Sequence, residues 1–330
     1  MKRILATAAL LLWGIAAQAA GQIVDAAYVA EAIKRGAIIW DARDSGSYAK
    51  GHIPGAVNVN QASMVLRNMN TEDFIPTPEI EKILGDAGID PSKEVIVYGS
   101  RGNSHVYFAL YALNYFGAPK AFIFHDGIEG WRAGGMPVET QPAKRPPVKL
   151  SLTPRPGVAV STREMVERLR KADVQIVDVR TPGEFTGDDI RALRGGHIPG
   201  AINIPYEQNW VDPDTPYKLS KKLVSDNSGM SLKSDADLKK LYEKLDPEKE
   251  TVVYCQSGVR AAETATVLSK LGFRNVKVYD SSWLAYGNQV DLPAENVQFF
   301  NVGVLNMKMS AMQSRIEGLE RELAEARGRK

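Results

Sequence analysis

Hydrophobic residues recur along the 330-residue chain in two patterns. Short apolar runs rich in β-branched residues, such as residues 95–98 and 251–254, predict buried strands of a parallel sheet. Longer stretches with apolar residues three or four positions apart, such as 27–35 and 162–171, predict amphipathic helices. Since strands alternate with helices, the sequence predicts an α/β fold in which helices cover both faces of each parallel sheet.

The same series of motifs is present twice, which indicates a tandem duplication. An Asp-x-Arg triplet at residues 41–43 recurs at 178–180, and a Gly-His-Ile-Pro-Gly-Ala turn at 51–56 recurs at 196–201. Each turn leads into a further apolar run. The chain is therefore predicted to hold two α/β domains that share one fold.

The segments around the duplication complete the predicted organisation. Residues 141–157 carry five prolines and little apolar periodicity, which is typical of a stiff, extended linker. The predicted segments are a signal peptide at 1–19, a first domain at 20–140, the linker at 141–157, a second domain at 158–300 and a C-terminal amphipathic helix at 301–330.

The N-terminus has the three parts of a secretory signal peptide. Lys2 and Arg3 precede an apolar run at 4–17, and small residues follow up to a predicted cut after Ala19. The alternative, an uncleaved membrane anchor, is disfavoured because about 14 apolar residues fall short of the roughly 20 that span a bilayer. We therefore expect a periplasmic or secreted protein with no membrane contact after cleavage.

The charge balance gives no reason to expect a polyanionic partner. The chain has 41 basic and 39 acidic residues, and residues 1–19 contain two of the basic ones, so the predicted mature chain has 39 of each sign. A near-neutral chain predicts neither nucleic acid nor an anionic membrane as a partner.

Cys255 is the only cysteine in the sequence, and it stands where a predicted strand turns into a predicted helix. Such a turn leaves the first N–H groups of the helix unpaired, and the helix dipole adds partial positive charge, so the turn favours an anion. We expect a thiol held there to ionise readily and to act as a nucleophile. The alternative is a small buried core residue, since free cysteine is often buried.

The motifs in this order resemble those of the rhodanese family of sulfurtransferases, over almost the whole chain to about residue 300. Besides the duplicated triplet and turn, they include Cys-Gln-Ser-Gly-Val-Arg at 255–260 and Val-Tyr-Asp-Ser-Ser-Trp at 278–283. The resemblance implies that Cys255 takes sulfane sulfur from an anionic donor such as thiosulfate, becomes a persulfide, and passes the sulfur to a thiophilic acceptor such as cyanide. The first domain has Gly99 in place of the cysteine, so we expect it to be inert. No cofactor is implied.

The residues expected to bind the substrate sulfur include the rest of the loop, namely Gln256, Ser257, Gly258, Val259 and Arg260. The fixed charge and forked donors of Arg260 suit an oxyanion of the donor, and the alternative is an ion pair with Glu263 or another acid. Arg180 is a second candidate. Because its Asp-x-Arg triplet recurs in the first domain, where no cysteine stands, structural support is the favoured role for Arg180.

The length and the residues of the cysteine loop distinguish this predicted function from other functions of related proteins. Phosphatases and arsenate reductases of related fold have five residues between cysteine and arginine, whereas this loop has four, so a phosphatase is disfavoured. A 3-mercaptopyruvate sulfurtransferase stays open, because Ser257-Gly258-Val259 resembles the loops of those enzymes. Thiosulfate is favoured as donor because the loop keeps the basic Arg260. A persulfide carrier or interaction module without turnover also stays open.

The histidines are expected to be structural. His52 and His197 occupy the same turn in the two copies, so hydrogen bonding within the turn is favoured over catalysis. His105 and His125 have no partner at metal-ligand spacing, so no metal is predicted.

Two segments leave alternatives open. Residues 206–233 form a polar insertion that is either part of the rim of the reactive loop or a solvated surface loop. An apolar stripe on the predicted C-terminal helix favours packing either on the protein's own surface or against a second copy or another partner. Its members are Met309, Met312, Ile316, Leu319 and Leu323.

Overall fold

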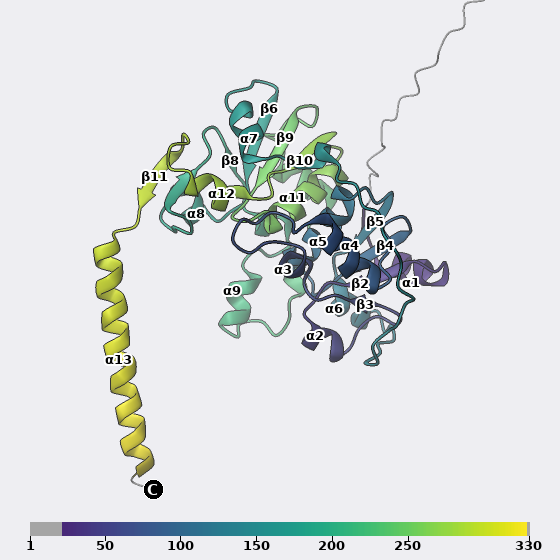
Figure 1. Cartoon of the computed structure of the whole chain (residues 1–330), viewed down its shortest axis with the longest axis horizontal. Coiled ribbons are helices and arrows are strands. Elements are labelled where there is room, and N and C mark those ends of the chain that lie inside the picture. The colour runs from purple at the N-terminus through teal and green to yellow at the C-terminus, as the bar shows by residue number, and fades with distance from the viewer. Residues whose placement is uncertain (1–21, 329–330) are drawn as a thin grey trace, which may run out of the picture.

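A computed structural model describes residues 22–328 as two α/β domains side by side, followed by one long helix that projects from the second domain (Figure 1). The predicted signal peptide at 1–19 lies outside the described residues. No helix in residues 22–328 combines the length and apolarity needed to cross a membrane.

The first domain is built on a five-stranded parallel sheet with the strand order β1-β5-β4-β2-β3. Side chains alternate between its faces, so Ile38 and Val95 pack beneath α4 and α5, whereas Ile39 and Ile96 pack beneath α1 and α6. The elements are β1 (Ile23–Val24), α1 (Ala26–Lys34), β2 (Ile38–Asp41), α2 (Ser45–Ala49), β3 (Val57–Asn58), α3 (Ala62–Val65), α4 (Thr77–Asp86), β4 (Glu94–Tyr98), α5 (Ser104–Tyr115), β5 (Lys120–Phe124) and α6 (Gly127–Ala133).

The second domain repeats this plan with a four-stranded parallel sheet in the order β10-β9-β6-β8. Val253 faces α11, and Val252 on the opposite face packs with α7 and α12. The elements are η1 (Pro156–Val158), α7 (Thr162–Arg168), β6 (Val174–Asp178), α8 (Pro182–Thr186), β7 (Arg194–His197), β8 (Ile202–Asn203), η2 (Tyr206–Asn209), α9 (Thr215–Ser220), η3 (Ser228–Met230), α10 (Asp235–Leu241), β9 (Glu250–Tyr254), α11 (Val259–Lys270), β10 (Asn275–Val278) and α12 (Ser282–Asn288). The prediction of two parallel α/β domains is confirmed.

A small antiparallel sheet, which the sequence did not predict, leads to the C-terminal helix. Strand β11 (Glu295–Phe299) pairs with β7. The long helix α13 (Val302–Gly328) follows directly.

One hydrophobic cluster crosses the contact between the two domains. Helices α5 and α11 pack against each other and join the apolar residues on one face of each sheet, whereas the opposite faces form a separate cluster in each domain. Since α5 is enclosed between its own sheet and α11, the whole run from Val106 to Leu113 is buried, and an enclosed helix is apolar on all sides. This contact places the first domain next to the residues that begin α11.

The connecting segments add further contacts between the domains. Residues 141–155 run without helix or strand, and the N–H of Val148 donates to the carbonyl of Gly85 in α4 (2.9 Å). The insertion at 206–233 folds into η2, α9 and η3 and reaches the first domain near its end, while its middle part, residues 220–226, is exposed. There His125 Nε2 contacts the carbonyl of Met230 (2.8 Å), and Ser231 Oγ donates to Asp126 (2.7 Å).

Candidate active site

The loop that carries the cysteine connects β9 to α11. Strand β9 ends at Tyr254 and α11 begins at Val259, so residues 255–258 make the turn. Gly258 has a φ angle of +79°, and a Cβ atom there would collide with the carbonyl oxygen of Asp280. The backbone path of the loop therefore requires glycine at this position.

A serine from the neighbouring loop fixes this turn. The hydroxyl of Ser282 accepts the N–H groups of Cys255 (3.1 Å) and Gly258 (3.0 Å) and donates to the carbonyl of Tyr279 (2.6 Å). Ser282 has a φ angle of +51°, which a residue with a side chain rarely adopts. A strained residue whose hydroxyl makes three hydrogen bonds, two of them to the loop, indicates that the position of this hydroxyl matters.

The loop offers several donors to an anion at the cysteine. The N–H groups of Gln256, Ser257, Val259 and Arg260 have no acceptor among the residues that the structure describes. They lie at the N-terminus of α11, where the helix dipole adds partial positive charge. Cys255 is only 1% exposed and belongs to the apolar cluster at the domain contact, so a negative charge on its sulfur would depend on these backbone donors rather than on water.

The side chain of Gln256 binds a backbone carbonyl outside the loop. Its Nε2 donates to the carbonyl of Arg191 (2.6 Å), while Oε1 is buried with no partner among the described residues. Gln256 therefore ties the loop to the segment that precedes β7.

Arg260 is held by a buried carboxylate. Its two terminal nitrogens donate to the two oxygens of Glu184 (2.7 and 2.8 Å), and Arg191 approaches the same carboxylate at 3.1 Å. The Glu184 side chain is 1% exposed. The partner of Arg260 is thus Glu184 and not Glu263, which accepts the indole N–H of Trp210 instead (2.9 Å).

The charges of this cluster follow from its geometry. Burial acts to raise the pKa of Glu184, but the hydrogen bonds and charge of Arg260, aided by Thr181 and Arg191, lower it to about 2. Burial acts to lower the pKa of Arg260, but Glu184 and the nearby Cys255 raise it. Two guanidinium groups share one carboxylate, so the cluster keeps one net positive charge. Arg191 is the cation of this cluster that faces solvent, because 51% of its side chain is exposed, compared with 15% of the Arg260 side chain.

Arg180 is enclosed by the scaffold. Its guanidinium donates to Asp178 (2.6 Å) and to the carbonyl of Gly196 (2.8 Å), and it lies 4.7 Å from the ring centre of Trp283. With 1% of the residue exposed, this geometry favours structural support over a direct contact with substrate.

The first domain also reaches the loop, through Arg67. This guanidinium donates to the carbonyl of Ser257 (2.6 Å), forms an ion pair with Glu72 (3.0 Å) and lies over the ring of Phe108 (4.8 Å). A buried arginine of one domain therefore holds the backbone of the other domain's reactive loop.

The histidines take part in structural contacts. Nδ1 of His52 donates to the carbonyl of Tyr48 (2.9 Å), and Nδ1 of His197 donates to that of Phe185 (2.8 Å), so both side chains make structural hydrogen bonds, but to carbonyls that precede the turn rather than within it. His105 contacts the hydroxyl of Ser63 (2.6 Å). Within residues 22–328, no group of three or more His, Cys, Asp and Glu side chains is placed to hold a metal ion.

Four of these contacting residues were missed by sequence reasoning, namely Ser282, Glu184, Arg191 and Arg67. A signal existed for Glu184, because Thr181 and Glu184 have the spacing of a capping box, which they form at the start of α8. No signal existed for Arg67, which lies 190 residues from its partner Ser257 in the sequence.

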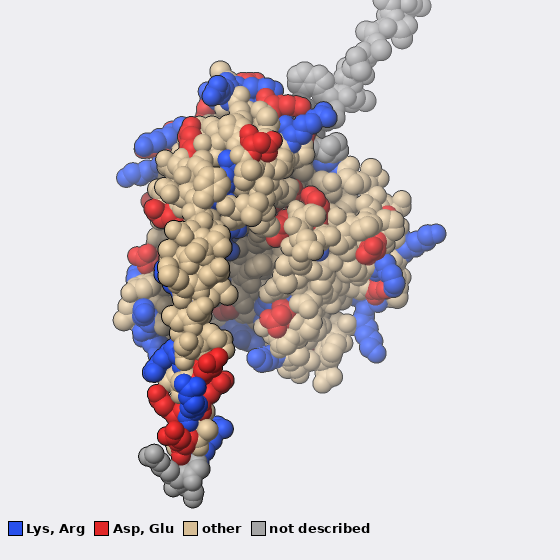
Figure 2. All heavy atoms as spheres, turned by 60° about the vertical axis from the view of Figure 1, so that its left-hand side comes forward, with Lys and Arg blue, Asp and Glu red and all other residues tan. Residues whose placement is uncertain are grey.

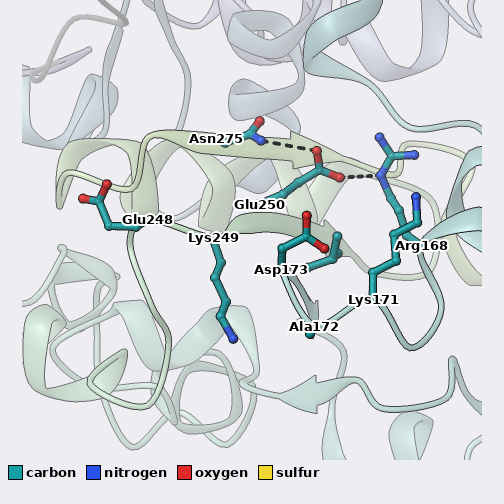
Figure 3. Close-up of a pocket in the computed structure, with 9 residues that line it drawn as sticks. Arg168, Lys171, Ala172, Asp173, Glu248, Lys249, Glu250 and Asn275 are labelled. Carbon is teal, nitrogen blue, oxygen red and sulfur yellow. Dashed lines mark hydrogen bonds and ion pairs between the residues drawn. The ribbon is translucent and has the colours of Figure 1, made fainter.

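A surface pocket of about 550 Å³ lies where strands β6, β9 and β10 of the second sheet begin, at the end opposite to the cysteine loop (Figure 3). It is lined by Asp173, Lys249 and Glu250, and Glu250 is held there by Arg168 and Asn275. Glu250 begins β9, whereas Cys255 follows its end, so the length of the strand, roughly 16 Å, separates the two. This pocket is therefore distinct from the cysteine loop.

Fold and site together define a protein of two similar α/β domains, the second of which carries a cysteine in a loop suited to anions. The model of the rhodanese-like domain matches residues 25–134 and again residues 161–289. The chain therefore belongs to the rhodanese family, and it is a tandem-domain sulfurtransferase of the thiosulfate sulfurtransferase type.

Curated relatives cover most of the chain. A thiosulfate sulfurtransferase of Corynebacterium glutamicum is 35% identical over 266 residues, which are 76% of this chain and 82% of the relative. A thiosulfate sulfurtransferase of Azotobacter vinelandii is 31% identical over 261 residues, 78% of this chain and 90% of the relative.

Among solved structures, the anaerobic ergothioneine biosynthesis enzyme of Chlorobium limicola, in complex with trimethyl histidine, has a similar fold. Its TM-score is 0.70 at 23% identity, over 83% of this chain and 70% of that one. At this identity the likeness concerns the fold alone.

Proposed function

We propose that the protein transfers sulfane sulfur from thiosulfate to a thiophilic acceptor through a persulfide on Cys255. The Cys255 thiolate attacks the outer sulfur of thiosulfate, the S–S bond breaks, and sulfite leaves with the electron pair. An acceptor such as cyanide then attacks the outer sulfur of the persulfide, thiocyanate leaves, and the Cys255 thiolate is regenerated.

The observation that carries this proposal is the set of loop N–H groups around Cys255. Four of them have no acceptor among the described residues, and a terminal persulfide sulfur is an anion that could accept them. The net positive charge of the Arg260, Glu184 and Arg191 cluster supports an anionic donor.

The experiment is mass spectrometry of the protein after incubation with thiosulfate. We expect one added sulfur atom per chain, located on the peptide that contains Cys255 and removed by cyanide with release of thiocyanate. Sulfur that stays on the chain when cyanide is added would instead favour a carrier without turnover.

Thiosulfate is preferred over 3-mercaptopyruvate as the donor. The relatives of Corynebacterium glutamicum and Azotobacter vinelandii are named thiosulfate sulfurtransferases, and Arg260, although paired with Glu184, belongs to a cluster that keeps one positive charge through Arg191. Steady-state kinetics with both donors test this choice, and a higher kcat/KM for mercaptopyruvate would contradict it.

We also propose that the protein acts outside the cytoplasm. Residues 1–19 have the charged, apolar and small-residue parts of a signal peptide. N-terminal sequencing of the protein recovered from the periplasm or the medium should begin after Ala19. Recovery of the intact N-terminus from the cytoplasm would contradict export.

The exposed C-terminal helix suggests a further role in contact with a partner chain. Met309, Met312 and Ile316 on α13 are all at least 48% exposed. Sulfur transfer itself does not require this surface.

A further inference from the structure

Helix α13 carries an apolar surface that its own chain leaves uncovered. The helix projects away from both domains (Figure 1). Its large apolar side chains are exposed, from 39% for Val304 to 66% for Met307. Packing on the protein's own surface, one of the two alternatives for this stripe, is therefore not what the structure shows.

The stripe follows a heptad repeat through the whole helix. Apolar residues recur at alternate spacings of three and four over more than three heptads, which is the pattern of a two-stranded coiled coil. The first seam position is occupied by Val302, Met309, Ile316 and Leu323, and the second by Leu305, Met312, Leu319 and Ala326. Two of the first positions, Val302 and Ile316, are β-branched, and two of the second positions are leucine, a combination that favours two parallel helices.

We propose that α13 joins two copies of this chain through a parallel two-stranded coiled coil. The residues that flank the seam support a second copy as the occupant. In a parallel pair, Arg315 would face Glu320 of the second copy, and Glu322 would face Arg327 of the second copy. Both contacts join opposite charges, and the twofold axis repeats each of them.

The opposite orientation mixes repulsive and attractive contacts. Two antiparallel copies in full overlap would bring Arg315 against Arg315 of the second copy, with like charges in contact, and Lys308 against Glu322, with opposite charges in contact. Figure 2 shows that charged side chains gather on the C-terminal half of α13, whereas its N-terminal half is mostly uncharged. A parallel pair keeps the charged halves together and the uncharged halves together.

The helix also needs support that a single copy does not give it. Gly318 lies in the interior of α13, where a glycine weakens an exposed helix by about 1 kcal/mol relative to alanine. Isolated helices are marginal in water, and most helices are stabilised by packing of an apolar face. Pairing along the seam would supply that packing.

The first test measures the mass of the full chain in solution by light scattering. We expect twice the 36.2 kDa chain mass, less any cleaved N-terminal segment. Leu319→Asp places a charge in the seam and should give a monomer, while the matched exchange Arg321→Asp, on the outer face of the helix, should leave a dimer. Sulfur transfer should be unchanged in both variants. A monomeric native chain at all concentrations would overturn the proposal.

The second test examines orientation. Arg315→Glu should weaken the dimer about tenfold, since two attractive pairs become repulsive, and addition of Glu320→Arg should restore it. Ala326→Cys, in a Cys255→Ala background, should form a disulfide between two copies, because the two positions 326 meet only in a parallel pair. A dimer without this restoration and without cross-linking would contradict the parallel arrangement.

Discussion

The two domains have the same scaffold and differ at the loop where sulfur would be held. In the first domain, the N–H of Ile128 donates to the carbonyl of Gly99 (2.9 Å), and in the second the N–H of Trp283 donates to that of Cys255 (3.0 Å). Gly99 and Cys255 therefore occupy matching positions. A Cβ atom on Gly99 would collide with Val106, so the first domain lacks both the thiol and the space for it.

The two domains share the contacts of the arginine in the Asp-x-Arg triplet. Arg43 donates to the carbonyl of Gly51 (2.8 Å), and Arg180 donates to that of Gly196 (2.8 Å), each beside its own aspartate. Because the same contact is present in the domain without a cysteine, it indicates that Arg180 supports the scaffold. Contacts found only in the second domain are the ones to test for function.

The largest expected effect comes from removal of the thiol. Cys255→Ala should lower thiocyanate formation from thiosulfate at least about 1,000-fold, because the persulfide cannot form. The fold should persist, as judged by circular dichroism. Activity that survives the exchange would contradict the persulfide route.

The reciprocal exchange completes the comparison. Gly99→Cys in the Cys255→Ala background should not restore activity, because Val106 fills the space of the new side chain. Overpacking should also lower the free energy of unfolding by roughly 1–3 kcal/mol. Thiocyanate formation by this double variant would show that the first loop had kept its site.

The second effect concerns the carboxylate that holds Arg260. Glu184→Gln should lower the free energy of unfolding by roughly 3 kcal/mol, because it leaves a buried guanidinium without its charge partner. Denaturant titration measures this loss. The matched control Glu167→Gln, which removes the exposed partner of Arg163, should change the stability by less than about 0.5 kcal/mol.

The same carboxylate predicts a pH dependence. Its pKa is lowered from 4.5 to about 2 by folding, so its contribution is fully present above pH 4.5 and is lost as the pH falls to about 2. That contribution is about 3 kcal/mol. If Glu184→Gln loses stability over this range as steeply as the native chain, the carboxylate is not responsible.

The third effect tests the contact that crosses the domains. Arg67→Met should lower kcat/KM for thiosulfate about tenfold and the free energy of unfolding by about 2 kcal/mol, because the Ser257 carbonyl and Glu72 lose a shared donor. Arg101→Met, which removes the ion pair with Asp126 at the first domain's loop, is the control and should leave kcat/KM unchanged. Equal losses of activity in both variants would exclude a specific role for Arg67.

Local patterns explain why much of the fold could be predicted. Residues 251–254 are a β-branched run, and Cys255 with Gly258 marks the turn that follows, so strand, loop and helix could be inferred from neighbouring residues alone. The duplication added an internal comparison that separated Cys255 from the shared scaffold.

The contacts that could not be predicted join residues that are distant in the sequence and meet only after folding. Glu184 lies 76 residues from Arg260 in the sequence, and no periodicity connects them. The insertion at 206–233 is polar, which resembles a solvated loop, yet its Met230 packs against the position of Gly102 in the first domain. Ser282 was also hidden, because a positive φ angle is normally indicated by glycine.

The smallest effect separates the hydroxyl of Ser282 from its backbone strain. The matching residue in the first domain is Gly127, with a φ angle of +56° against +51° for Ser282. Ser282→Ala keeps the strain and leaves the N–H groups of Cys255 and Gly258 without their acceptor, whereas Ser282→Gly loses the same acceptor but relieves the strain. The glycine variant should therefore be more stable than the alanine variant by about 1 kcal/mol, measured by denaturant titration, while kcat/KM for thiosulfate falls by a similar factor in both. Full activity in the glycine variant would mean that the hydroxyl is not needed to hold the loop, and the second domain would then differ functionally from the first by its thiol and its charges alone.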